Sequence, residues 1–213
     1  MDRVTFSRAS QDYIDNYDNY NHKVWNTTKG MVAKIRKEVR NHYKIQQRYL
    51  CCYCRQQTLQ DHGFVWDCEH ILPKAIYPKF LFEPLNLALS CKACNLAKEK
   101  YKHELIISEK DQYCENSNNY RIIHPHFDLY NKHLTVKTID GTTVHEVNSE
   151  KGTFTYKCCD LKRFDKKLAG YDTINDDVAL TVSNLLNSGM DAKQVVEALR
   201  NKKVAIERNT DFA

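Results

Sequence analysis

Apolar residues recur at helical spacing in the segment 31–48, MVAKIRKEVRNHYKIQQR. Most of them fall three or four residues apart, on one stripe made by Met31, Val32, Ile35, Val39 and Tyr43. This period is typical of an amphipathic α-helix. Lysine and arginine occupy many of the remaining positions, so the pattern predicts a helix with a strongly basic outer face.

The segment 1–28 that precedes this helix is polar and weakly patterned, with many Asp, Asn and Tyr residues. No period of 3.6 or 2 residues dominates it, so the pattern does not assign it an element. We expect a segment that either docks on the rest of the chain or is partly mobile.

Turn-forming residues divide the segment 49–103. Gly63 stands between LQDH and FVWDCEHIL and predicts a turn that joins two short strands. Three prolines keep residues 73–85 out of a long helix, so this stretch is expected to be a loop; they are Pro73, Pro78 and Pro84. A helix is predicted to begin at or near Asn95, a good capping residue. The predicted order is strand, turn, strand, loop, helix.

After a polar connector at residues 104–125, alternation returns in LTVKTIDGTTVHEV, residues 134–147. Asp140-Gly141 stands between two alternating runs and predicts a tight β-hairpin turn. The β-branched and aromatic residues of TFTYK, 153–157, predict another strand.

Two helices are expected near the C-terminal end, at residues 174–188 and 191–206. Ser188-Gly189 should separate them, and Asp191 should cap the second. The sequence therefore predicts an α+β fold in three segments. An N-terminal segment with a basic helix spans 1–48, a core spans 49–103, and a hairpin with a helical extension spans 104–213.

The chain has 213 residues, 42% of them apolar, and a net charge of +5. This length and composition support a hydrophobic core, and the mild positive charge is compatible with a polyanionic partner. We find neither a run of about 18 apolar residues nor an apolar secretory signal, so a cytoplasmic protein without a membrane segment is expected. Nine cysteines, an odd number, argue against a framework made only of disulfides.

Four of the cysteines form two CxxC pairs, Cys51 with Cys54 and Cys91 with Cys94. In a reducing compartment, two such pairs match a tetrahedral structural zinc site with four thiolate ligands. The alternative is two buried cysteine pairs without a metal. The five other cysteines lack ligand spacing and are expected to be buried or incidental thiols: Cys52, Cys68, Cys114, Cys158 and Cys159.

Between and beside the CxxC pairs, the chain carries Glu69-His70, then Asn86, then Asn95 directly after Cys94. The pattern EHILPK…LNLALSCKACNLAK resembles the HNH endonuclease motif in its zinc-clamped, four-cysteine form, over about residues 50–102. This resemblance implies a ββα-metal core with a structural zinc, here flanked by helices and a β-hairpin.

The resemblance also implies roles for the motif residues. His70 would be the general base, Glu69 and Asn95 would bind a catalytic divalent ion, and Asn86 would steady the loop and orient the histidine. Glu stands where Asp is common, and Asn rather than His ends the motif, so the ligand set stays open.

Phosphodiester hydrolysis independently requires these residue types. A neutral imidazole can accept a proton from water near neutral pH. Mg²⁺ or Mn²⁺ can stabilise a phosphate through carboxylate and amide oxygen ligands. Neighbouring residues of a strand point to opposite faces, which fits Glu69 as a ligand and His70 as a base. Three lysines could contact the nucleic-acid backbone or remain solvated: Lys74, Lys92 and Lys98.

The resemblance implies a DNA endonuclease, with double-stranded DNA as the expected partner. IIHPHFDLYNKHL resembles the segment after the motif in HNH subunits of Septu and retron-linked anti-phage systems, which act beside an ATPase. A restriction or mobile-element HNH enzyme is an alternative, and a non-catalytic zinc module that binds nucleic acid or protein is another. In this segment, His124, His126 and His133 could bind a metal or pack on the core.

Overall fold

A computed structural model describes residues 1–59, 65–109, 111–139, 142–168, 182–183 and 185–199. The chain forms two compact units. The first comprises Met1–Leu134 and Val147–Asp160, and the second comprises Thr135–Glu146 and Leu161–Ala213. No helix within the described ranges is both long enough and apolar enough to cross a bilayer. The division at residues 48 and 103 remains a prediction.

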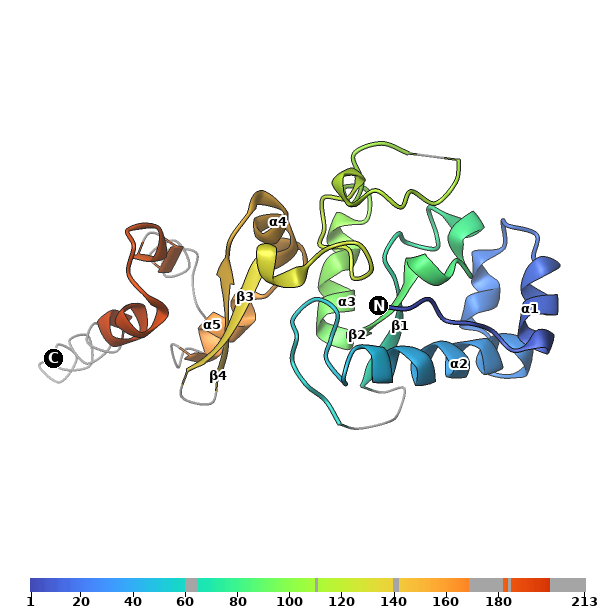
Figure 1. Cartoon of the computed structure of the whole chain (residues 1–213), viewed down its shortest axis with the longest axis horizontal. Coiled ribbons are helices and arrows are strands. Elements are labelled where there is room, and N and C mark those ends of the chain that lie inside the picture. The colour runs from blue at the N-terminus through green and yellow to red at the C-terminus, as the bar shows by residue number, and fades with distance from the viewer. Residues whose placement is uncertain (60–64, 110, 140–141, 169–181, 184, 200–213) are drawn as a thin grey trace, which may run out of the picture. The chain divides into compact units, whose positions relative to one another are not determined.

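The predicted basic helix is helix α2, Gly30–Gln46 (Figure 1). Four residues of its predicted stripe are buried, and they contribute to the core of the first unit: Val32, Ile35, Val39 and Tyr43. Helix α2 packs against a two-stranded antiparallel sheet made by β1, Trp66–His70, and β2, Leu87–Cys91. The helical period of the apolar residues is sufficient to predict this element correctly.

The N-terminal segment docks on α2 through helix α1, Arg8–Asp15, and a 3₁₀-helix η1, His22–Asn26. The Glu38 carboxylate of α2 accepts hydrogen bonds from the Ser7 hydroxyl at 2.8 Å and from the Ser10 hydroxyl at 2.9 Å. Because these anchors are polar, the apolar pattern gives no sign of them. The docked alternative for this segment is the one observed.

The partner of strand β1 differs from the expected one. β1 pairs with β2 from Trp66 opposite Cys91 to His70 opposite Leu87, so the two strands are joined across the long loop and not by a tight turn. Gly63, the predicted turn residue, lies outside the described residues. The loop at 73–85 is confirmed, apart from two short 3₁₀-helices at Pro78–Phe80 and Pro84–Asn86.

Helix α3, Lys92–Lys98, begins earlier than the predicted start at or near Asn95. The N-cap position belongs to Cys91, the last residue of β2, so Asn95 lies inside the helix and does not cap it. The second CxxC pair therefore forms the strand-to-helix turn. Helix α3 contacts both strands of the sheet.

Residues 153–157, predicted to form a strand, belong to helix α4, Glu150–Cys158. The Ser149 side chain caps this helix by accepting a hydrogen bond from the Gly152 amide at 3.0 Å. A Cβ at position 152 would clash with the His133 carbonyl, so only glycine permits this close approach. Capping and packing override the β-propensity of TFTYK.

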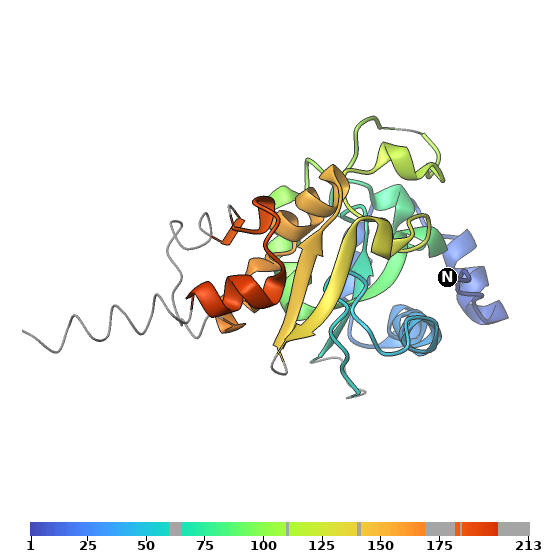
Figure 2. The same ribbon diagram turned by 60° about the vertical axis from the view of Figure 1, so that its left-hand side comes forward.

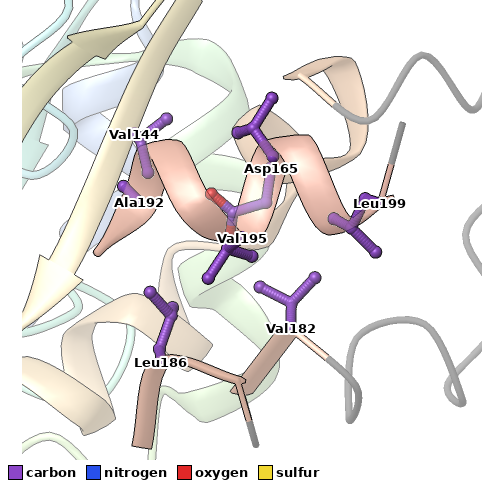
Figure 3. Close-up of a pocket in the computed structure, with 8 residues that line it drawn as sticks. Val144, Asp165, Val182, Leu186, Ala192, Val195 and Leu199 are labelled. Atoms are coloured by element: carbon purple, nitrogen blue, oxygen red, sulfur yellow. The ribbon is translucent and has the colours of Figure 1, made fainter. Parts of the chain in front are cut away.

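The second unit contains the predicted hairpin, with strands β3, Leu134–Ile139, and β4, Thr142–Val147 (Figure 2). Its turn, Asp140-Gly141, lies outside the described residues. Helix α5, Lys162–Leu168, follows. Seven apolar side chains and Asp165 line a cavity of about 30 Å³ in this unit (Figure 3).

The predicted break and cap near the C-terminal end are confirmed. Gly189 has φ +87°, and its amide donates to the Leu186 carbonyl at 3.1 Å. Asp191 and Gln194 cap the following helix reciprocally, each accepting a backbone hydrogen bond of 2.9 Å from the other. The described part of this helix is 192–199; residues 174–181 and 200–206 of the two predicted helices lie outside the described residues.

Candidate functional site

The four CxxC cysteines converge as the sequence predicts. One ligand atom from each of Cys51, Cys54, Cys91 and Cys94 lies within 4.8 Å of the others. The Cys54 and Cys91 sulfurs are 3.8 Å apart. Tetrahedral zinc–sulfur bonds of about 2.3 Å place neighbouring sulfurs about 3.8 Å apart, so the observed spacing fits a zinc ion. The cluster is therefore compatible with a structural zinc site.

Backbone contacts bring the first CxxC turn to the sheet. The Cys52 amide donates to the Leu89 carbonyl of β2 at 3.0 Å, and the Arg55 amide closes the turn on the Cys51 carbonyl at 3.0 Å. The Cys91 amide donates to the Cys51 sulfur at 3.3 Å. An N–H donor directed at a sulfur favours its thiolate form, which is the form that binds zinc.

Strand β1 presents alternate residues to opposite faces. Asp67 and Glu69 reach side chains of helix α3. On the other face, the Cys68 thiol donates to the Arg36 carbonyl of α2 at 3.4 Å, and the His70 ring packs on Trp25 of η1. The Asp67 and Glu69 carboxylates thus point to one face of β1 and the His70 imidazole to the other, although the residues are neighbours in sequence.

The His70 ring is held on two sides. Its Nε2 lies 3.0 Å from the Leu81 carbonyl oxygen, and the Trp25 ring meets it edge to face at 4.4 Å. A carbonyl only accepts, so Nε2 carries the proton and the Nδ1 lone pair remains for proton transfer. Burial lowers the pKa of His70 to about 3, and the charges of Lys74 and Lys98 act in the same direction. The ring is therefore neutral at physiological pH.

Asn86 is fully buried and braces the loop on both sides of His70. Its Oδ1 accepts from the Leu72 amide at 2.7 Å, and its Nδ2 donates to the carbonyls of Leu72 at 3.1 Å and Phe80 at 3.0 Å. Leu72 follows His70 closely, and Phe80 precedes the residue whose carbonyl holds the ring. This arrangement agrees with the expected role of steadying the loop.

Glu69 is 1% exposed and forms an ion pair with Lys98, which is 4% exposed. The same carboxylate accepts from the Tyr53 hydroxyl at 2.9 Å. Burial raises the pKa of Glu69 above its ordinary value, whereas the Lys98 ammonium acts in the opposite direction. The expected ligand carboxylate thus has a buried counter-charge in this structure.

Lys98 is bonded to protein groups on every side, and its expected contact with nucleic acid remains a prediction. Its ammonium also donates to the carbonyls of His70 at 2.7 Å and Ile71 at 3.0 Å. An ammonium has three donors, and these two carbonyls together with Glu69 engage all of them. Lys98 is therefore a buried cation that ties α3 to the end of β1, with all three of its donors engaged by protein groups.

Asp67 is a site residue that sequence reasoning missed. Its Oδ2 accepts from the Asn95 amide nitrogen at 2.9 Å, and its Oδ1 pairs with Lys92 at 2.5 Å. The carboxylate in contact with Asn95 is thus Asp67 and not Glu69. Alternation along DCEH could have revealed it, because residues 67 and 69 share one face of a strand. Lys92 is half exposed, so it remains available at the surface.

Some of the candidate residues border one cleft of about 220 Å³ in the first unit, whereas Asp67, Asn86 and Lys92 are not among its lining residues. His70, Glu69, Asn95 and Lys98 all line it, as does the predicted lysine Lys74. The remaining lining residues come from η1, the end of β1, the loop and the segment after α3: His22, Asn26, Cys68, Pro73, Ala75, Glu99 and Lys102. His70 and Asn95 of the predicted motif therefore line one cavity.

The oxygen donors near this cleft have the chemistry that a hard divalent ion requires. Carboxylate and amide oxygens suit Mg²⁺, and Asp67, Glu69 and Asn95 supply them from β1 and α3. In chemical type the set fits such an ion, although Glu69 is engaged by Lys98 and Asp67 by Lys92.

The three histidines of the segment 124–133 each contact protein groups. The His124 Nε2 lies 2.9 Å from the Tyr113 hydroxyl, and the His126 Nε2 lies 2.8 Å from the Leu87 carbonyl. The His133 Nδ1 lies 2.8 Å from the Ser149 hydroxyl. Among the described residues, the only metal-binding group found is the four-cysteine cluster. The packing interpretation of these histidines is therefore the better supported one.

Compared with protein-family models and with curated proteins, the chain gives no match. The conclusions about its site therefore depend on the residues and their geometry.

Replacing Cys91 by serine should remove zinc and destabilise the fold. An apparent zinc-binding free energy of ~10–16 kcal/mol is comparable with the ~5–15 kcal/mol net stability of a domain. We expect zinc content, measured by elemental analysis, to fall from about one ion per chain to near zero, together with a loss of cooperative thermal unfolding. Cys114→Ser, outside the cluster, is the control. A stable, folded, zinc-free Cys91→Ser protein would contradict the zinc interpretation.

Replacing Lys98 by methionine should destabilise the chain because Glu69 would lose its buried counter-charge. We expect the free energy of unfolding in urea to fall by about 3–5 kcal/mol, and a second change, Glu69→Gln, to recover part of the loss. Lys92→Met is the matched control, because its ion pair is partly exposed and should contribute less than about 1 kcal/mol. Equal losses in the free energy of unfolding for Lys98→Met and Lys92→Met would show that the buried ion pair stabilises the fold no more than the partly exposed one.

Proposed function

We propose that this protein is a metal-dependent endonuclease of the HNH type that hydrolyses phosphodiester bonds, with double-stranded DNA as its substrate. The observation that supports this most is the cleft in which the neutral His70 imidazole, Glu69 and Asn95 meet. The cleft lies on a sheet and helix that share their turn with a four-cysteine cluster. This combination matches the chemical requirements of hydrolysis better than those of a passive binding module.

His70 acts as the general base in this proposal. As water attacks phosphorus, the Nδ1 lone pair takes a proton from the water, the bond from phosphorus to the 3′-oxygen breaks, and the leaving oxygen gains a proton from solvent. A base with a pKa of about 3 is weak in the free protein. A phosphate anion bound beside the ring raises this pKa by stabilising the imidazolium, so the base strengthens when substrate is present.

Asp67, Glu69 and Asn95 would hold the divalent ion, either Mg²⁺ or Mn²⁺. When bound there, such an ion supplies positive charge to the phosphate and leaving oxygens. Tyr53 and Lys98 both contact Oε1 of the Glu69 carboxylate, and the Asn95 amide nitrogen donates to Asp67, so Glu69 Oε2 and the Asn95 amide oxygen are the atoms that would reach the ion in this proposal.

The partner and the biological role are further parts of the proposal. Lys74 and Lys102 line the cleft, and Lys92 is exposed beside it, in keeping with a polyanionic substrate. The likeness of IIHPHFDLYNKHL to the corresponding segment of anti-phage HNH subunits favours a defence nuclease that works with an ATPase. A non-catalytic zinc module would need the four cysteines but not the anchored imidazole.

Replacing His70 by alanine should abolish hydrolysis and leave the zinc site intact. We expect nicking and linearisation of supercoiled plasmid in Mg²⁺ or Mn²⁺ to fall at least about a hundredfold, since general-base catalysis commonly contributes that much. His103→Ala, an exposed histidine that does not line the cleft, is the control. Unchanged cleavage by a zinc-loaded His70→Ala protein would overturn the assignment of the base. A wild-type protein that nicks no nucleic acid, alone or with a copurified partner, would favour the binding module.

A further inference from the structure

The 3₁₀-helix η1 forms a fixed wall of the cleft although it belongs to the polar N-terminal segment. Its Trp25 is 6% exposed and packs against the rings of His70 at 4.4 Å and Phe82 at 5.8 Å. The Arg36 guanidinium of α2 donates to the carbonyls of Trp25 and Thr27. One buried indole and one arginine thus hold the end of this wall against the candidate base.

The other end of η1 is also anchored. The Asp18 carboxylate accepts from the amides of Tyr20 at 2.8 Å and Asn21 at 2.9 Å, which fixes the turn that leads into the helix. The Val24 amide then donates to the Asn21 carbonyl at 3.2 Å. Because both ends are held, the backbone positions of the η1 residues that line the cleft are fixed in advance, so little backbone entropy is lost on binding.

Two of these side chains are His22 and Asn26, and both line the cleft beside His70 and Asn95. Within the described ranges, neither the His22 imidazole nor the Asn26 amide forms a side-chain hydrogen bond or ion pair. By contrast, Glu69, Lys98 and Asn95 are already bonded to protein groups. The His22 and Asn26 side chains can therefore bind a ligand without breaking a contact within the protein, whereas Lys98 cannot.

The charge around this wall indicates the class of ligand. Lys74 and Lys102 line the same cavity, Lys102 pairing with Glu99 at 2.7 Å, whereas Glu69 is neutralised by Lys98. Imidazole and amide N–H groups beside ammonium groups are suited to the oxygens of a phosphate.

We propose that His22 and Asn26 form a phosphate-binding subsite of the cleft, which holds the nucleic-acid backbone next to the bond presented to His70. This inference rests on the proposed function for its substrate class and adds residues that the HNH-like motif does not contain. The same geometry gives Trp25 a positioning role, because it connects the subsite wall to the imidazole. Substrate binding and base orientation are then coupled through one short helix.

The test compares three full-length, zinc-loaded proteins: the wild type, the double variant His22→Ala/Asn26→Ala, and a control double variant, His103→Ala/Asn118→Ala. The control residues are exposed and do not line the cleft. Binding of a fluorescein-labelled DNA duplex is measured by anisotropy in Ca²⁺, with inorganic phosphate as a competitor. Plasmid cleavage in Mg²⁺ or Mn²⁺ is measured separately, and zinc content and thermal midpoint establish that each variant is folded.

We expect the Kd of the subsite variant to rise at least about tenfold, as for a lost hydrogen bond to a charged group, and the control to match the wild type. Unchanged affinity of the subsite variant, or no duplex binding by the wild type, would overturn the subsite. Binding of inorganic phosphate that is as tight as that of the duplex and is weakened equally by the two substitutions would overturn its assignment to a nucleic-acid backbone. A wild type that binds through His22 and Asn26 but cleaves nothing would leave the subsite standing and refute the nuclease proposal.

Discussion

Four sulfurs drawn from two distant parts of the chain meet within 4.8 Å, and the candidate site depends on this convergence. Cys51 and Cys54 form a turn whose backbone is bonded to β2, while Cys91 ends β2 and Cys94 lies in the first turn of α3. A zinc ion bound by all four would fix the angle between strand and helix. That angle determines where Asn95 and Lys98 stand relative to β1.

Successive side chains of β1 point to opposite faces of the strand, so the candidate site residues lie in two different environments. Odd-numbered residues Asp67 and Glu69 face α3 and its ammonium groups, and His70 faces the aromatic wall of η1. On the face toward α3, each carboxylate pairs with a lysine. On the face toward η1, burial lowers the pKa of His70 and keeps its imidazole neutral. Acidic and basic residues can therefore be adjacent in sequence without forming an ion pair with each other, and Glu69 and His70 both line the cleft.

Local signals made α2, the hairpin strands and the Gly189–Asp191 break predictable, because apolar period, strand alternation and capping residues act over short distances. The spacing of the cysteines was equally informative, since zinc geometry constrains it strongly. The partner of β1 was not predictable in this way. Pairing of β1 with β2 spans a long loop, and no turn residue marks it.

The candidate site shows the same division. The motif pointed to His70, Asn86 and Asn95, and strand alternation could have added Asp67. His22 and Asn26 are recognisable only through the tertiary structure that places them in the cleft. The burial of Lys98 and its ion pair with Glu69 were not predictable for a related reason, since an exposed and a buried lysine look alike in sequence. Lys98 is buried because α3 packs against β1, and the order of residues along the chain does not reveal this packing.

The most direct test of the zinc-dependent geometry is amide hydrogen exchange before and after the metal is removed with a chelator. If the thiolate-bound ion fixes the strand-to-helix junction, amides of Trp66–His70 and Leu87–Cys91 should be protected in the zinc-loaded protein and exchange rapidly in the stripped protein. The β3–β4 hairpin of the second unit should keep its exchange rates and serves as the internal reference. Undiminished protection of β1 and β2 after complete zinc removal would contradict the account.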